Sequence, residues 1–99
     1  KQKIQTAYVN VADLDEYIQK TVNVVVQLQR VKNITDRKGQ EMCFIEAMDE
    51  TGSMDGVVFA SSYKNIGMML KKGNICLIQG KVNMKDKLSL IVDKARVVE

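Results

Sequence analysis

Short segments rich in apolar and β-branched residues recur along this chain between polar turns, and that pattern predicts β-strands. Residues 21–32 are rich in valine and show no helical period, so they predict a long first strand. Residues 42–49 and 53–59 predict two more strands, joined into a hairpin by a tight connection at residues 50–52. Residues 35–39, which contain an aspartate and a glycine, predict the turn between the first two strands.

The spacing changes after the third strand. Four apolar residues recur at helical intervals and predict a single helix: Tyr63, Ile66, Met69 and Leu70. We expect Ser61-Ser62 to cap the start of this helix. We expect Lys71-Lys72-Gly73 to end it, because cations stabilise the C-terminus of a helix and glycine stops one.

Two further strands are predicted after the helix. Residues 74–84 alternate between apolar and polar and include Gly80, where we expect a bulge or a bend. A turn at residues 85–87 leads into the last strand, which starts at residues 88–92 and runs towards Val97-Val98. Three strands, one helix and two strands predict an all-β fold, a five-stranded OB-fold Greek-key barrel with one helix between strands three and four.

The chain has 99 residues, enough for one domain with its own core. We assign residues 21–99 to the barrel and residues 1–20 to an N-terminal lead-in or linker segment packed on it. Within that segment, Asp13 is predicted to cap a short helical turn that contains Leu14, Tyr17 and Ile18.

The composition excludes several classes of protein. No run approaches the ~20 apolar residues of a membrane span, and the N-terminus lacks the apolar stretch of a signal peptide. We therefore expect a soluble, cytoplasmic domain with no membrane partner. Cys43 and Cys76 lie in apolar runs, and the chain has no histidine to complete a zinc site. Two buried thiols are favoured over a disulfide, and we expect no metal and no cofactor.

The predicted second strand carries the candidate binding face. If Ile45 and Ala47 point inward, the period-two rule places four residues on the outer face: Met42, Phe44, Glu46 and Met48. An exposed Phe44 would offer a stacking platform worth ~1–3 kcal/mol per base. The alternative is a register shifted by one residue, with Phe44 in the core. Phe59 directly precedes the helix, and we expect it in the core beneath that helix.

Cationic residues accompany this face, although the net charge of +3 is modest and fits weak polyanion binding. The loops that border the binding face of an OB barrel join strands one and two and strands four and five. Here those loops carry Arg37, Lys38, Lys85 and Lys87. Arg30, Lys32 and Lys81 are further candidates, for which solvated surface charge is an equal explanation. The candidate nucleic-acid-binding residues are Arg30, Lys32, Arg37, Lys38, Met42, Phe44, Glu46, Lys81, Lys85 and Lys87.

Asp49, Glu50 and Asp55 form an acidic cluster in the sequence. Metal-dependent phosphoryl transfer uses paired acids around two cations. These acids, however, flank a tight Thr-Gly turn, where aspartate favours local hydrogen bonds to the backbone. A structural role is therefore favoured. The chain also has no histidine and no nucleophile beside a base, so we predict no catalytic residues and no enzyme activity for this domain.

A series of short motifs carries a resemblance to a known family. The series is Arg37-Lys38-Gly39 to Met42-x-Phe44, Asp49-x-Thr51-Gly52, Val57-Val58-Phe59 to Tyr63, and Gly80-Lys81-Val82. In this order the motifs resemble the OB-fold of the alpha subunit of bacterial DNA polymerase III, over roughly residues 22–98. A looser form of the pattern is similar to the anticodon-binding domains of class II aminoacyl-tRNA synthetases.

The resemblance implies a non-catalytic module that binds single-stranded DNA and holds the template strand during replication. Its parent chain would be a DNA-directed DNA polymerase, a nucleotidyltransferase. The implied partners are single-stranded DNA and other domains or subunits of such a polymerase, and the isolated domain is expected to be a monomer. In the synthetase relatives, the phenylalanine similar to Phe44 stacks on a base. Two alternatives stay open, a tRNA anticodon-binding OB-fold and a barrel that docks another protein.

Overall fold

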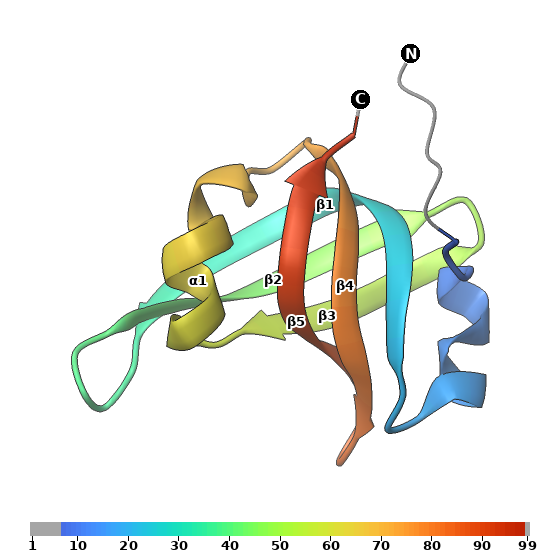
Figure 1. Ribbon diagram of the computed structural model, residues 1–99, viewed down its shortest axis with the longest axis horizontal. Coiled ribbons are helices and arrows are strands. Elements are labelled where there is room, and N and C mark those ends of the chain that lie inside the picture. Colours follow the sequence, from blue (N-terminus) through green and yellow to red (C-terminus); the bar gives the residue numbers. More distant parts are fainter. Residues whose placement is uncertain (1–6, 99) are drawn as a thin grey trace.

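The computed structural model describes residues 7–98 and forms a closed five-stranded barrel (Figure 1). The strand order around the barrel is β1-β2-β3-β5-β4. This arrangement confirms the predicted OB-fold barrel, with one α-helix between the third and fourth strands. The elements are η1 (Val11–Tyr17), β1 (Thr21–Thr35), β2 (Glu41–Asp49), β3 (Gly52–Val58), α1 (Ala60–Ile66), η2 (Gly67–Met69), β4 (Ile75–Met84) and β5 (Leu88–Val97).

The first strand closes the barrel because it belongs to two strand pairs. Its first half, from Thr21 to Gln27, pairs antiparallel with β4. Its second half, from Gln27 to Thr35, pairs antiparallel with β2, with a register shift between Leu28 and Arg30. The remaining closure is a short parallel pairing of β3 with β5. On the outer surface of β2, the side chains of Phe44, Glu46 and Met48 are exposed to solvent.

The observed first strand is three residues longer than the predicted 21–32. Lys32 pairs with Phe44, and Asn33 and Ile34 continue the ladder. The sequence does not predict this extension, because Lys32 and Asn33 are two successive polar residues. Both are exposed, since this end of the strand extends beyond the core. The turn that follows is as predicted: Asp36 Oδ1 accepts hydrogen bonds from the backbone N–H groups of Lys38 and Gln40. Gly39 adopts a φ of 81° there.

The helix begins earlier than predicted and ends sooner. Phe59, and not Ser61-Ser62, is the residue that precedes its first turn, and no side chain caps it. The α-helix stops at Ile66 and continues as the short 3-10 helix η2. Ile66 and Leu70, two of the four residues at helical spacing, are buried in the core as expected. In Figure 1 the helix α1 covers one end of the barrel.

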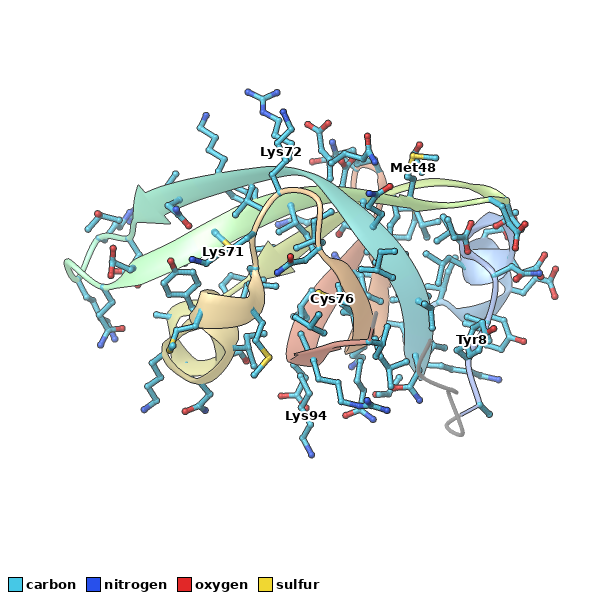
Figure 2. The ribbon with its side chains drawn as sticks, turned by 90° about the horizontal axis from the view of Figure 1, so that it is seen from above. Tyr8, Met48, Lys71, Lys72, Cys76 and Lys94 are labelled. Atoms are coloured by element: carbon cyan, nitrogen blue, oxygen red, sulfur yellow. The ribbon has the colours of Figure 1, made fainter. Side chains whose placement is uncertain are left out.

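The core is built from the inward-facing residues of the strands. They include Ile45 and Ala47, so the predicted register of β2 is confirmed. Cys43 and Cys76 are both fully buried, and no disulfide joins the two thiols. Burial raises the pKa of the Cys43 thiol to about 11. Figure 2 shows Cys76 inside the barrel and Met48 pointing away from it on the outer surface.

The segment before the barrel packs on it at the end opposite α1 (Figure 1). Val11 and Leu14 are members of the core cluster, and Tyr17 packs against that cluster. The 3-10 helix starts at Val11 after Asn10, so the prediction that Asp13 caps it was wrong; Asp13 lies inside its first turn. The first six residues of the predicted segment 1–20, and residue 99 of the predicted barrel 21–99, lie outside the described residues.

Gly80 lies at the predicted irregularity in the fourth strand. The register between β4 and β5 shifts between Gln79 and Gly80. A Cβ atom on Gly80 would lie 2.5 Å from the carbonyl oxygen of Ile91, which explains why the strand has a glycine where the two backbones approach.

None of the helices described in residues 7–98 has the length and apolar character needed to cross a bilayer.

Candidate nucleic-acid interface

The outward-facing residues of β1, β2 and β3 line up in rows across the sheet. In one row, Lys32 pairs with Phe44, which pairs with Val57. In the next row, Arg30 pairs with Glu46, which pairs with Asp55. Because side chains two residues apart on a strand share a face, the two rows lie side by side on the same outer surface. The aromatic ring and the charged groups are therefore immediate neighbours.

These rows form the floor of a groove with a volume of about 760 Å³. One wall comes from the turn between β4 and β5, with Lys85, Asp86 and Lys87. The end of β3 supplies Val57 to the lining, and Phe59, directly before α1, also lines the groove. The groove brings together seven of the ten predicted binding residues: Arg30, Lys32, Met42, Phe44, Glu46, Lys85 and Lys87.

Two aromatic side chains line this groove, and both are about half exposed. Phe44 has 46% of its surface accessible, so the alternative that it is a core residue was wrong. Phe59 is 48% accessible, and the prediction that it lies in the core was also wrong. The inward residues of β3 are Met54, Gly56 and Val58. Extending that alternation by one residue places Phe59 outside, a signal that was present in the sequence.

Met42 differs from its neighbours on the outer face. It lines the groove, but only 8% of its surface is accessible. It lies opposite Ile34 on the extended end of β1. Met42 is therefore part of the floor of the groove and offers little free surface to a ligand.

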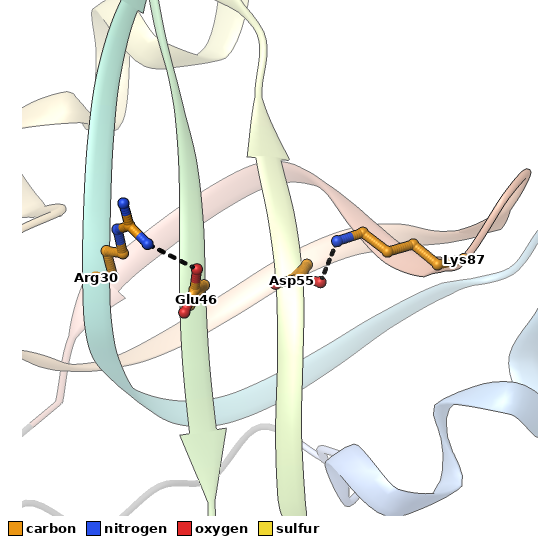
Figure 3. Close-up of polar contacts among 4 residues, drawn as sticks. All are labelled: Arg30, Glu46, Asp55 and Lys87. Carbon is orange, nitrogen blue, oxygen red and sulfur yellow. Dashed lines mark ion pairs between the residues drawn. The ribbon is translucent and has the colours of Figure 1, made fainter.

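Four charged side chains cross the groove in a line, drawn in Figure 3. Arg30 Nη1 lies 3.6 Å from Glu46 Oε2, and Lys87 Nζ lies 2.8 Å from Asp55 Oδ2. The two carboxylates belong to residues directly opposite each other on β2 and β3. Like charges in that position repel, and a cation on each side offsets the repulsion. The hydrogen bond to Asp55 and the charge of that carboxylate raise the pKa of Lys87.

Among the described residues, no ion pair holds Lys32 or Lys85 in the groove. Their ammonium groups are exposed, one on β1 beside Phe44 and one on the turn between β4 and β5. With Arg30 and Lys87 they make four cations against three acids in the lining, a net charge of +1. The groove is thus cationic at its two sides and acidic along the middle of one row.

Three predicted binding residues lie outside the groove. Arg37 and Lys38 are at the tip of the β1–β2 hairpin, which extends beyond the barrel in Figure 1. Lys81 lies on β4, in a smaller hollow that also includes Phe59, Ser61 and Ser62. The order of the strands predicts that these three residues lie on the surface of the barrel. It does not predict their distance from the groove, because that distance depends on the length of the hairpin and the tilt of the strands.

The acidic turn between β2 and β3 has the structural role that its sequence favours. Asp49 Oδ1 accepts hydrogen bonds from the Thr51 hydroxyl and from the backbone N–H groups of Thr51 and Gly52. Asp49 Oδ2 accepts one from the N–H of Val11, at 2.9 Å. Burial opposes ionisation of Asp49, but these hydrogen bonds outweigh it and lower the pKa of the carboxyl group. Asp49 therefore ties the turn to the N-terminal segment.

Comparison with known proteins matches residues 21–98 to a family model of the tRNA anti-codon type, described as an OB-fold nucleic acid binding domain. The whole chain is 28% identical to part of the DNA polymerase III subunit alpha of Bacillus subtilis (strain 168), over 100 residues. It is also 28% identical, over 76% of its length, to the same subunit of Staphylococcus aureus (strain MRSA252). The resemblance to the polymerase III alpha subunit is thereby confirmed.

The chain spans only 9% of the length of the Bacillus protein and 7% of that of the Staphylococcus protein. A solved structure described as an aspartyl-tRNA synthetase from Leishmania major Friedlin superposes with a TM-score of 0.78. That match covers 99% of this chain and 23% of the other, at 17% identity, and it concerns the fold alone.

Proposed function

Because this chain belongs to the family of OB-fold nucleic acid binding domains, we propose that its groove binds single-stranded DNA. We further propose that it does so as a non-catalytic module of a replicative polymerase, where it holds the template strand. The similarity to polymerase III alpha subunits supports the second part. One observation carries the proposal: Phe44 and Phe59 expose their rings in the same groove, beside the exposed ammonium groups of Lys32 and Lys85.

Unpaired bases need the kind of surface that the two phenylalanines provide. A base exposed in a single strand keeps one π-face free, and stacking on an aromatic ring contributes about 1–3 kcal/mol per base. A duplex hides those faces within its own stack. Two half-exposed rings in one groove would therefore favour a single strand over a double helix.

The charges in the groove set the expected strength of binding. Lys32 and Lys85 are available to phosphates, whereas Arg30 and Lys87 are held by carboxylates. If these two lysines neutralise about two phosphates, the slope of log K against log salt should be shallow, about −1.4. We therefore propose that the isolated module binds weakly and depends on the rest of the assembly for tight attachment to DNA.

Fluorescence anisotropy with a labelled oligo-dT tests this proposal. Phe44→Ala and Phe59→Ala should each weaken binding, by about five- to 150-fold for a loss of about 1–3 kcal/mol. Met68→Ala is the matched control, because Met68 is 88% exposed and does not line the groove. Binding by the wild-type protein that neither phenylalanine variant reduces would refute the proposed site.

The two other candidate functions give different results in the same assay. A module of the anticodon-binding type would bind an RNA anticodon stem-loop more tightly than DNA of equal length. A protein-docking barrel would bind neither nucleic acid, and capture of a polymerase subunit would survive substitution of Phe44. The comparison of oligo-dT with the RNA stem-loop therefore separates all three.

A further inference from the structure

The four-residue charge row in Figure 3 lies next to the proposed stacking platform. Phe44 and Glu46 are two residues apart on β2 and share its outer face, so their Cα atoms are separated by about 6.6 Å along the strand. Asp55 lies opposite Glu46, just as Val57 lies opposite Phe44. A base stacked on Phe44 would therefore have one edge within reach of the two carboxylates.

The row leaves acceptor capacity on both carboxylates. Each ion pair uses one named oxygen, Glu46 Oε2 towards Arg30 and Asp55 Oδ2 towards Lys87. A carboxylate has two oxygens and about four lone-pair directions, so each group is able to accept further hydrogen bonds. The side chains of Glu46 and Asp55 are 56% and 40% exposed, which leaves them accessible from the groove.

A carboxylate pair in this position distinguishes the two parts of a nucleotide. Phosphate oxygens and the free carboxylate oxygens of Glu46 and Asp55 are all acceptors, so a base edge with a donor and not the backbone should face these two carboxylates. Among base edges, a carboxylate accepts from an amino group, such as N4 of cytosine. It faces an unfavourable contact with the O4 carbonyl oxygen of uracil or thymine, because both groups are acceptors. Those two bases offer the carboxylates only the single N3–H on this edge, whereas the amino group of cytosine offers two N–H groups.

We propose that Glu46 and Asp55 make the groove selective for bases that carry an exocyclic amino group, so that it binds oligo-dC more tightly than oligo-dU or oligo-dT. This inference rests on the proposed function, because it assumes that a base stacks on Phe44. Arg30 and Lys87 are positioning residues in this scheme. They hold the adjacent carboxylates in place through the two ion pairs.

The test compares labelled oligo-dC with oligo-dU of the same length by anisotropy at neutral pH. Cytosine and uracil have similar rings and differ at position 4 and in the proton on N3, so stacking and phosphate contacts are closely matched. The wild-type protein should bind oligo-dC at least about fivefold more tightly, the lower range expected for one good contact to a base edge. The double variant Glu46→Gln, Asp55→Asn should bring the ratio of the two affinities close to one.

The double variant Asp15→Asn, Glu16→Gln is the control for the loss of two negative charges, since both residues are exposed on η1 and do not line the groove. It should leave the ratio unchanged. A wild-type ratio near one, or a preference that persists in the double variant, would overturn the inference while leaving single-strand binding intact. Absence of binding to either oligonucleotide would refute both the inference and the proposed function. A misfolded variant would lose affinity for both probes and is recognised by its circular dichroism, in which case the single variants Glu46→Gln and Asp55→Asn decide the ratio.

Discussion

Replacing Leu14 with alanine tests whether the segment before the barrel is part of the folded domain. Leu14 is 1% exposed and belongs to the same core cluster as the strand residues. Truncation of a buried leucine to alanine costs about 2–5 kcal/mol, because apolar contacts are lost and a cavity remains. A cost of about 3 kcal/mol would lower the Tm by about 12–24 °C in a domain of this size.

Thermal unfolding followed by circular dichroism measures this effect. Ile18→Ala is the matched control: Ile18 lies just after the same 3-10 helix but is 40% exposed. A surface substitution of this kind usually changes stability by less than about 0.5 kcal/mol. A fragment comprising residues 21–99 should be less stable still than Leu14→Ala. It lacks both Val11 and Leu14, and Asp49 loses the N–H of Val11.

Two results would contradict this reasoning. The first is that Leu14→Ala and Ile18→Ala melt at the same temperature, and the second is that the fragment 21–99 melts at the same temperature as the whole chain. Either result would make the segment a separable linker. The family match begins at residue 21, so the expected result would extend the folded unit beyond the matched range.

Three further predictions concern the turn, the barrel and the groove. Asp49 has a lowered pKa in the fold, so its stabilising effect is present above the unfolded pKa of about 3.9 and is lost as pH falls through the folded value. In urea titrations at several acidic pH values, the free energy of unfolding should therefore fall less steeply with decreasing pH in Asp49→Asn than in the wild-type protein. Gly80→Ala should destabilise the barrel by about 1–3 kcal/mol because its Cβ would lie 2.5 Å from a backbone oxygen, whereas Gly52→Ala, with 3.8 Å to its nearest neighbour, should cost less in the same denaturation assay. Lys32→Gln should reduce the slope of log K against log salt for oligo-dT binding by about 0.7, whereas Arg37→Gln at the hairpin tip should leave that slope unchanged. Equal effects of the two substitutions would mean that the bound DNA also contacts the β1–β2 hairpin.

The sequence predicts the fold well because each element leaves a local pattern. The inward residues of β2 and β3 alternate regularly, so the register that exposes Phe44 follows from the period-two rule. The turn at Asp36 and Gly39 and the bulge at Gly80 depend on residue types with few other uses. These features are encoded within a few positions of one another, and they were predictable for that reason.

Features that depend on contacts between distant residues were not predictable in the same way. The ion pairs of Arg30 with Glu46 and of Lys87 with Asp55 require the register between strands and the path of the last turn. The burial of Leu14 requires the N-terminal segment to fold back on the barrel end. Phe59 is a different case, since the alternation along β3 already places it outside, and the helix that begins at Ala60 does not cover its ring.

The parallel pairing of β3 with β5 has a consequence for how the barrel opens. It consists of three residue pairs, Asp55 with Ser89, Gly56 with Leu90 and Val57 with Ile91, fewer than any other strand pair in residues 7–98. Local opening is favoured where a structure has few contacts, and three residue pairs give few backbone hydrogen bonds between β3 and β5. Asp55, Val57 and Ser89 sit on this seam, and Lys87 on the adjoining turn reaches across it to Asp55. A ligand bound across this strand pair would hold β3 and β5 together. Amide hydrogen exchange in β5 would then slow as the site becomes occupied.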